Sequence, residues 1–507
     1  MDFVALIDLV KTVTKNKVKN IEVLGNSGTS VEDSLIETFY EAISKGRVTS
    51  DEEAVKFLYG KKETVKSSNY LRTRNRLIRQ LINVSLFIDL NQPMFNERAK
   101  AYYNCYRDFA SAHILTLRDA HLAAIDVFEQ TLEQAIKYEF IELTADLTRE
   151  LRKLYARISG DQTKHEKISQ LHREYEEKRR LEMLALEHYE NLLHYYIIKR
   201  SPNDEVHKYA TTSFEELTTL APKADTSQFY FYTYQIGIIK AFAVNDCKTA
   251  LDTCNTCLEI LQQRKNTNRA ALGGLALQKI GCLTQLRIFN QECDQTVEYC
   301  LSILEEGHLN WFRTHELHLH YCLFAKRYND ALQIYDKVSK HPKFPTLAGA
   351  IRDNWNIYGG YLHLLAALGK LDAKKVTEIV GEYRYSIMIT EIEVLTKDKE
   401  GMNIPLVLLP VVYALVNGTF EDFGVSPDAL EKYRRRYLDT DLNKRSAAFV
   451  NLLFAYAKKD YRSASAEKKI KKELEVLASV QPQVAGSQTF AVEIIPYEDL
   501  WAMMMEK

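Results

Sequence analysis

Alternation of helix-forming stretches with short breaks is the feature that most restricts the fold of this chain. From about residue 95 to residue 385, amphipathic segments follow one another, separated by breaks such as GDQTK, SPNDE, VNDCK and HPKFP. These breaks carry the Gly, Pro, Asn and Asp that are common at helix ends. Glycine (19) and proline (10) are scarce among the 507 residues, which favours long helices. The pattern predicts an all-α protein.

The segments group into helical hairpins. The predicted pairs are residues 97–116 with 119–136, 138–157 with 163–199, 228–244 with 246–264, 268–287 with 290–306, 309–325 with 328–340, and 347–368 with 371–383. One hairpin cannot bury its apolar face alone, whereas stacked neighbours bury it for each other and form an extended surface. We therefore expect an α-solenoid with a concave face that suits peptide or protein segments.

Small and aromatic residues lie four positions apart in several of these helices, and therefore on one helix face. The pairs are Ala124 with Phe128, Ala331 with Tyr335, and Gly359 with Trp355. This pattern resembles the tetratricopeptide repeat, in which such pairs let two helices approach closely. The resemblance implies a right-handed solenoid that binds other proteins and is not an enzyme.

The two ends of the chain differ from its middle. We expect a helical unit at residues 1–90, the repeat array at 91–420 and a helical cap at 421–507, with helices near 427–438, 443–458 and 461–478. The last segment, TFAVEIIPYEDLWAMMMEK, is rich in large apolar residues. We expect it to dock over the final apolar face of the array through Val492, Ile494, Ile495, Leu500 and Trp501.

Charge and hydropathy exclude several classes of protein. The formal net charge is −1, so no global field draws the chain onto nucleic acid or anionic lipid. The longest apolar run, Ile404 to Val416, is too short to span a bilayer and contains Pro405 and Pro410. The first residues, MDFVALIDLVKTVTKNK, lack the pattern of a secretory signal. We expect a cytoplasmic protein with no membrane partner, whose eight cysteines are reduced thiols.

A metal site is the first chemical alternative. The segment THELHLHYC brings together His315, His318, His320 and Cys322. His315 and His318 share a helix face but His320 does not, and leucine at position 319 breaks the HExxH spacing of zinc proteases. Partly buried or surface histidines are the simpler interpretation.

Other signatures of chemistry are weak. Cys254 and Cys257 form a CxxC motif, but no second CxxC lies at zinc-ribbon spacing. We therefore interpret both cysteines as small residues that pack between helices. The segment VLGNSGTS lacks the Gly-Lys-Ser/Thr of a phosphate-binding loop. We expect no catalytic residue, metal or cofactor, although an enzyme with a site assembled from distant residues stays open as an alternative.

One segment stands out by its charge. Residues 61–79, KKETVKSSNYLRTRNRLIR, carry seven basic residues and one acid and follow a short helix. Leucines and isoleucines in and after the segment give it an apolar face, and the β-prone LINVSLFIDLN follows. The alternative interpretation is a basic solvated face on a capping helix.

The order helix, turn, basic helix, strand-like segment resembles the winged-helix domain of transcriptional regulators that carry a bacterial activation domain of tetratricopeptide repeats. The resemblance implies that Arg72, Arg74, Arg76 and Arg79 contact phosphates or base edges. Strands are expected near residues 21–24 and 84–88.

We therefore expect a scaffold or adaptor that binds a protein or peptide partner on the concave face of the array. The candidate contacts are Tyr230, Tyr232, Tyr234, Trp311 and Tyr361, each of which alternates with core positions. The alternative is a transcriptional regulator in which the basic helix binds DNA or an acidic partner and the repeats act as a sensor.

Overall fold

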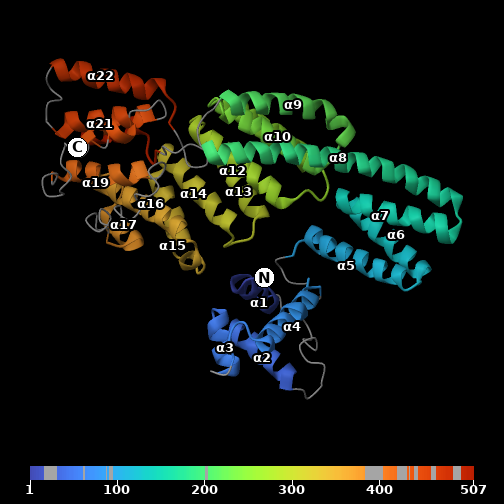
Figure 1. Cartoon of the computed structure of the whole chain (residues 1–507). Coiled ribbons are helices and arrows are strands. Elements are labelled where there is room, and N and C mark those ends of the chain that lie inside the picture. Colours follow the sequence, from blue (N-terminus) through green and yellow to red (C-terminus); the bar gives the residue numbers. More distant parts are fainter. Residues whose placement is uncertain are drawn as a thin grey trace. The chain divides into compact units, whose positions relative to one another are not determined.

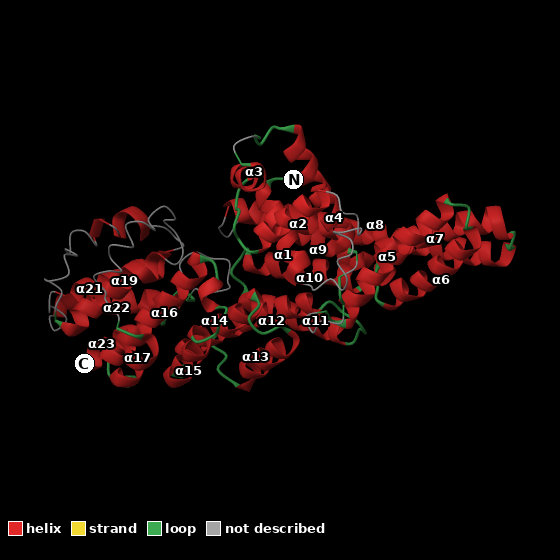
Figure 2. Cartoon of the chain, turned by 90° about the horizontal axis from the view of Figure 1, so that it is seen from below, coloured by secondary structure: helices red, strands yellow, loops and turns green. Residues whose placement is uncertain are grey.

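A computed structural model of the chain describes residues 1–15, 31–60, 63–86, 88–90, 95–199, 204–382, 403–418, 431–432, 434–438, 443–457, 464–482 and 493–507. Every regular element in these ranges is a helix, and Figure 2 shows no strand among them. The all-α prediction is confirmed. The chain divides into two compact units, Met1–His172 and Arg173–Lys507. The boundaries between the three units predicted from the sequence, near residues 90 and 420, remain predictions.

The first unit begins with four helices around one apolar core (Figure 1). These are α1 (Phe3–Lys15), α2 (Val31–Ser44), α3 (Asp51–Tyr59) and α4 (Ser68–Ser85). Leu6, Phe39, Tyr70, Leu77 and Leu81 are fully buried at their centre. The unit continues with α5 (Glu97–Leu117), α6 (His121–Lys137), α7 (Ile141–Leu154), the π-turn η1 (Tyr155–Ser159) and the start of α8 (Gln162–Lys199).

The prediction of a strand at residues 84–88 is wrong. Helix α4 continues to Ser85, and Val84 is buried as part of its apolar face with Tyr70, Leu77 and Leu81. The β-prone composition of LINVSLFIDLN is overridden because these residues continue the helical spacing that fills the core. The other strand expected, at residues 21–24, lies outside the described residues.

The second unit contains the remaining helices. They are α9 (Asp204–Ala224), α10 (Ser227–Phe242), α11 (Cys247–Gln262), α12 (Arg269–Gln285), α13 (Gln291–Ile303), α14 (Leu309–Phe324), α15 (Tyr328–Ser339), α16 (Gly349–Ala367), α17 (Ala373–Val380), α19 (Asn403–Asn417), α21 (Lys444–Ala457), α22 (Ala464–Ser479) and α23 (Tyr497–Glu506), with η2 (Phe344–Thr346) and η3 (Arg434–Leu438). Most consecutive helices pack on each other; α16 packs on both α17 and α19, and α12 also packs on α14. The predicted pairs omitted α9, which packs on α10.

Side-chain caps fix where many of these helices begin. Thr226, Asp246, Asn268, Asn290 and Asp372 each accept a hydrogen bond from a first-turn backbone N–H of the helix that follows. Such caps satisfy amides that have no partner within the helix, and each contributes about 1 kcal/mol. The polar breaks in the sequence therefore mark true helix starts.

One turn geometry recurs at the ends of several helices, between one helix and the next. A residue with positive φ follows the helix, and the next amide donates to a carbonyl five residues earlier, as Asp246 N does to Ala241 O at 2.9 Å. This is the Schellman motif. The positive-φ residues are Asp119, Glu139, Asn245, Arg287, Lys326 and Gly369, and the matching amides are those of Ala120, Phe140, Asp246, Ile288, Arg327 and Lys370.

Small residues let neighbouring helices of the array approach closely. Ala331 is fully buried in α15. At Gly359 in α16, an added Cβ would lie 2.9 Å from the Tyr335 hydroxyl and 2.9 Å from a methyl of Val380. The small residue at 359 is therefore required by the approach of α15 and α17.

The apolar run from Ile404 to Val416 forms most of α19. Its side chains are largely buried in the core that extends from α10 to α23. No helix in the described ranges is long and apolar enough to cross a bilayer.

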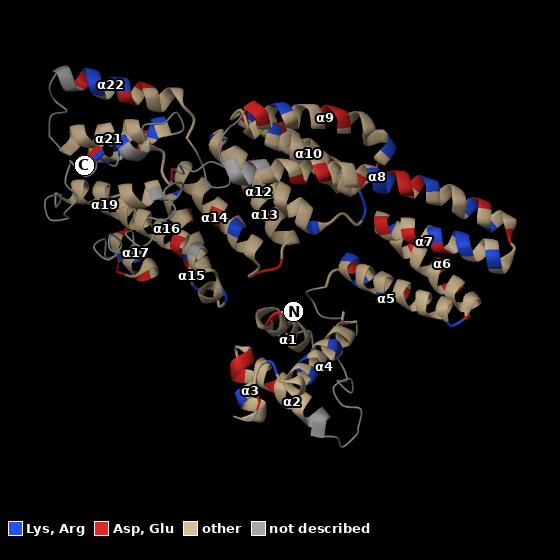
Figure 3. Ribbon diagram, viewed as in Figure 1, with Lys and Arg blue, Asp and Glu red and all other residues tan. Residues whose placement is uncertain are grey.

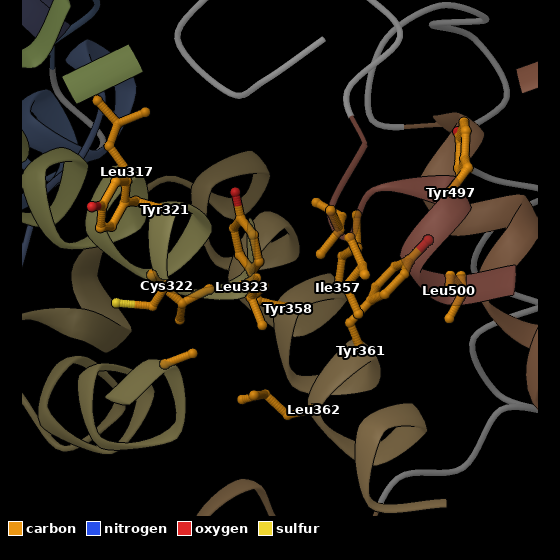
Figure 4. Close-up of a cluster of buried hydrophobic side chains, with 14 of the residues drawn as sticks. Leu317, Tyr321, Cys322, Leu323, Ile357, Tyr358, Tyr361, Leu362, Tyr497 and Leu500 are labelled. Atoms are coloured by element: carbon orange, nitrogen blue, oxygen red, sulfur yellow. The ribbon is translucent and has the colours of Figure 1, made fainter. Parts of the chain in front are cut away.

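The C-terminal segment packs into the same core, as expected. Ile494, Ile495, Leu500 and Trp501 are at most 6% exposed. Figure 4 shows Leu500 of α23 and the Tyr361 ring of α16 directed toward each other. Val492 lies outside the described residues.

Candidate functional site

Helix α4 presents two contrasting faces. Tyr70, Leu77, Leu81 and Val84 recur at helical spacing and fill the core of the first helices. The opposite face is exposed and contains no acidic residue, since the helix sequence SNYLRTRNRLIRQLINVS lacks Asp and Glu. The α4 face, as we name this exposed side, is defined by Leu71, Arg72, Asn75, Arg76, Arg79, Ile82 and Leu86. Figure 3 colours the Lys and Arg positions along the α4 ribbon blue.

Arg74 differs from the other three arginines of α4. Its guanidinium forms an ion pair with Asp51 at 2.9 Å and donates a hydrogen bond to the Met1 carbonyl at 2.8 Å. The Tyr70 hydroxyl donates to the same carboxylate, and burial, with Asp51 beside it, raises the pKa of Tyr70. Arg74 therefore joins α4 to the start of α3, whereas Arg72, Arg76 and Arg79 are exposed.

Helix α5 carries an exposed apolar stripe. Tyr102, Tyr106, Ile114 and Leu117 follow one side of the helix at spacings of three, four and eight residues. Ile114 is 60% exposed and Leu117 is 82% exposed, and Leu122 at the start of α6 is 71% exposed. We call these five residues the α5 stripe. The other faces of α5 hold Cys105 and Ala112 against α6, and polar residues such as Ser111.

The two tyrosines of the α5 stripe are held by other rings. Their ring centroids lie 4.6 Å apart, and Tyr102 also meets Phe140 edge to face at 5.3 Å. Burial raises the pKa of Tyr106, and Tyr102 adds to the shift. The stripe therefore begins with tyrosines that pack against other rings and ends with largely exposed aliphatic side chains.

The three tyrosines of α10 are half-buried and already have partners. The ring of Tyr230 lies 5.0 Å from the Arg264 guanidinium. Tyr232 packs beside Tyr189, with ring centroids 5.5 Å apart. Tyr234 meets Phe214 edge to face at 6.1 Å. Burial raises the pKa values of Tyr232 and Tyr234.

Trp311 and Tyr361 lie in the core. Trp311 is 4% exposed, and its ring packs against His315 and His341 at 4.3 and 4.9 Å. Tyr361 is 2% exposed and donates a hydrogen bond to the Pro405 carbonyl at 3.1 Å. Neither side chain offers a contact surface, because packing between helices occupies both rings.

The histidines of α14 point to different neighbours. His318 shares a hydrogen bond with Asp294 at 3.1 Å, and His320 shares one with the Glu493 carbonyl at 2.5 Å. Burial lowers the pKa of His315 to about 3 and that of His320 to about 4. No group of His, Cys, Asp and Glu suited to a metal ion occurs among the described residues.

The cysteines are buried thiols. Cys254 and Cys257, the CxxC pair of α11, are both fully buried between helices, which agrees with a packing role. Burial raises the pKa of Cys257 to about 12, so this thiol is protonated and unreactive at neutral pH. The segment VLGNSGTS lies outside the described residues.

The α5 stripe is the surface that the sequence reasoning missed. Its signal was present, because Tyr102, Tyr106, Ile114 and Leu117 form a second apolar set beside the residues that face α6. No protein-family model, curated protein or solved structure matches the chain.

Proposed function

We propose that this protein is a non-enzymatic scaffold or adaptor that binds a protein or peptide partner in the cytoplasm. The observation that carries the proposal is the α5 stripe, a set of large apolar side chains exposed along one side of α5 and at the start of α6. Repeated Schellman turns and packing between consecutive helices support a tetratricopeptide-like, right-handed α-solenoid as the framework.

The composition of the α5 stripe favours a protein partner. Single exposed leucines are common on protein surfaces, but contiguous apolar patches mark interaction sites. Tyrosine is enriched among the residues that dominate binding energy, and its ring loses little conformational entropy when it is bound. Burying one large aliphatic side chain contributes about 1.5–3 kcal/mol. Ile114 and Leu117 together therefore contribute about 3–6 kcal/mol of gross binding free energy, from which the cost of association is subtracted. A micromolar affinity corresponds to about 8 kcal/mol net, so further contacts of the stripe are required.

A comparison of matched variants tests the proposal. Full-length Ile114→Glu/Leu117→Glu and the control Ser111→Glu are purified, and each is used for quantitative affinity capture from cells that express the protein natively. All three positions are exposed on α5, so the substitutions change stability by less than about 1 kcal/mol. We expect one or more proteins retained by the wild type and the control but lost from the double variant. Equal retention by all three proteins would reject the stripe as the binding surface.

A second candidate function is nucleic-acid binding by the α4 face. Arg72, Arg76 and Arg79 are exposed about one helical turn apart on a helix without acids, a spacing that suits successive phosphates. Three phosphate contacts predict that log K falls with log salt at a slope of about −2.7. The exposed Leu71, Ile82 and Leu86 on the same face favour a protein partner instead.

Electrophoretic mobility shifts decide this second candidate. Wild-type protein, Arg72→Ala, Arg79→Ala and a control variant are titrated with mixed duplex fragments at several salt concentrations. The control is Arg47→Ala, which changes an exposed arginine between α2 and α3, outside the α4 face. DNA binding predicts that each α4 variant reduces the salt slope by about 1, whereas Arg47→Ala does not. Absence of any shift at low salt would remove the candidate.

A further inference from the structure

The last residues of the chain form a short helical segment with large apolar anchors. Residues 493–507, the C-terminal segment, contain α23 and place seven apolar side chains in the core of the second unit. These are Ile494, Ile495, Tyr497, Leu500, Trp501, Met503 and Met504, each at most 6% exposed. The Tyr497 ring stacks on Phe449 of α21 with centroids 4.5 Å apart. Helical segments with such anchors are a common form of peptide ligand.

Acidic residues of the C-terminal segment meet basic residues on the turns of three successive hairpins. Glu498 pairs with Arg287 on the α12–α13 turn. Asp499 pairs with Lys326 on the α14–α15 turn at 2.8 Å. Two further contacts lie at the α16–α17 turn, where Glu506 pairs with Lys370 at 2.7 Å and the Lys507 ammonium donates to the Ala367 carbonyl at 2.7 Å.

The repetition of these pairs has a structural cause. Arg287 and Lys326 are the positive-φ residues of their Schellman turns, and Lys370 follows Gly369 in the third. The same turn thus places one cation in each hairpin along the path of α23. Opposite charges in register across an interface fix the orientation of a ligand.

A buried ion pair anchors the start of the C-terminal segment. The Arg445 guanidinium donates to Glu493 at 2.5 and 2.9 Å and to Glu498 at 2.6 Å. Arg445 is 5% exposed and Glu493 is 2% exposed. Burial raises the pKa of Glu493 in spite of the arginine. Burial also opposes ionisation of Glu498, but the charges of Arg445 and Arg287, together with hydrogen bonds, outweigh it and lower that pKa.

We infer that the surface formed by these three turns and by α21 is a peptide-docking surface, and that the C-terminal segment is its occupant in the folded chain. Its ligand is a short helix with acids in the first turn and Leu-Trp anchors on one face, as in Glu-Asp-Leu-Trp at 498–501. The same peptide supplied in trans competes with the chain's own segment. This inference deepens the proposed function, but its residues are separate from the α5 stripe.

A binding experiment with the full chain tests the inference. Fluorescently labelled peptide 493–507 is titrated into wild-type protein and into Leu500→Asp/Trp501→Asp, which weakens the chain's own segment and leaves the docking surface unchanged. A tethered ligand acts at an effective concentration of about 1 mM, so the peptide competes poorly in the wild type. We expect fluorescence anisotropy to show saturable binding to the variant and at least about tenfold weaker apparent affinity for the wild type.

The control peptide carries the same Leu-Trp to Asp-Asp change and is expected not to bind. If the labelled peptide binds neither protein while the variant keeps its wild-type circular dichroism, the inference is overturned; equal binding to both proteins also overturns it. Affinity capture through the α5 stripe does not involve these residues, so failure there leaves this result unaffected.

A charge exchange supplies a second test that does not depend on how the Leu500→Asp/Trp501→Asp variant folds. The Lys326 side chain is 61% exposed and that of Asp499 is 18% exposed, so both can be changed without opening the core. We expect Lys326→Asp to increase hydrogen exchange of α23 amides at least about threefold, and Lys326→Asp/Asp499→Lys to restore most of the protection. No rescue in the double variant would contradict the proposed pairing.

Discussion

At the scale of single residues, burial between helices determines the partner of each α14 histidine: His318 lies against Asp294, and His320 lies against the Glu493 carbonyl. The spacing of these histidines in the sequence separated His320 from the face shared by His315 and His318. What His320 contacts could not be predicted, since its partner is the Glu493 carbonyl, far away in the sequence. Likewise, Trp311 and Tyr361 could be core or contact residues by pattern, and the structure places both in the core.

Burial of His320 predicts a loss of stability in mild acid. Its ring is surrounded by Phe324, Tyr358 and the Glu493 carbonyl, and burial, with Arg313 nearby, lowers its pKa from 6.5 to about 4. Below pH 6.5 the His320 imidazole binds a proton in the unfolded chain but not in the folded chain. The free energy of unfolding therefore falls as the pH falls toward 4. Between pH 7 and pH 5 this group accounts for about 2 kcal/mol.

Urea unfolding of wild-type protein and His320→Gln at pH 7 and pH 5 measures this loss. Glutamine keeps a donor for the Glu493 carbonyl but cannot titrate. We expect the wild type to lose about 2 kcal/mol more than the variant over this interval. Parallel losses in the two proteins would show that the burial of His320 does not control the acid response.

At the scale of elements, helix type and position followed closely from the sequence. The breaks between helices carry capping residues and turn residues, so the predicted hairpins lie within a few residues of the observed helices from α5 to α17. Two predictions from the sequence failed at this scale: helix α9 was omitted, and a strand was assigned near Val84. Both segments have their apolar residues at helical spacing, and tertiary packing on neighbouring helices outweighs local composition.

The Schellman turns were not visible in the sequence because most of their positive-φ positions are not glycine. Glu139, with φ of 51°, is such a residue between α6 and α7. A residue with a Cβ in this region costs about 1–2 kcal/mol relative to right-handed conformations, and glycine avoids that cost at some expense in unfolded-state entropy.

We therefore expect Glu139→Gly to raise the free energy of unfolding by about 0.5–1 kcal/mol, measured by urea denaturation. Glu139→Val serves as the matched control, because a β-branched residue is least tolerated at positive φ. The Val variant is expected to be less stable than the wild type. If Gly and Val had the same effect, the turn geometry at this position would be wrong.

At the scale of the whole molecule, the sequence could predict that its last segment docks, but not where. Apolar residues from Ile494 to Trp501 require burial wherever they lie, and this much follows from hydrophobicity alone. The contacts of the segment with Arg287, Lys326 and Arg445 join residues that are distant along the chain. Such pairings depend on the folded array, so no local pattern signals them.

The buried Arg445–Glu493 ion pair at the start of the C-terminal segment leads to a prediction about stability. Arg445→Met leaves the Glu493 carboxylate buried without its partner, which costs about 3–5 kcal/mol. Arg445→Met/Glu493→Gln removes both charges and is expected to recover at least half of the loss. Urea unfolding followed by Trp fluorescence measures both values. A single variant as stable as the wild type would show that the pair is not buried in solution.

Site-specific photo-crosslinking tests whether the α5 stripe contacts a partner protein. A photoreactive amino acid is placed at position 117 in the stripe or at position 111 on the polar side of α5, and the protein is irradiated in cells that express it natively. We predict a crosslinked product of discrete mass from position 117 that is absent from position 111 and disappears with Ile114→Glu. No product from position 117, or identical products from both positions, would contradict the claim.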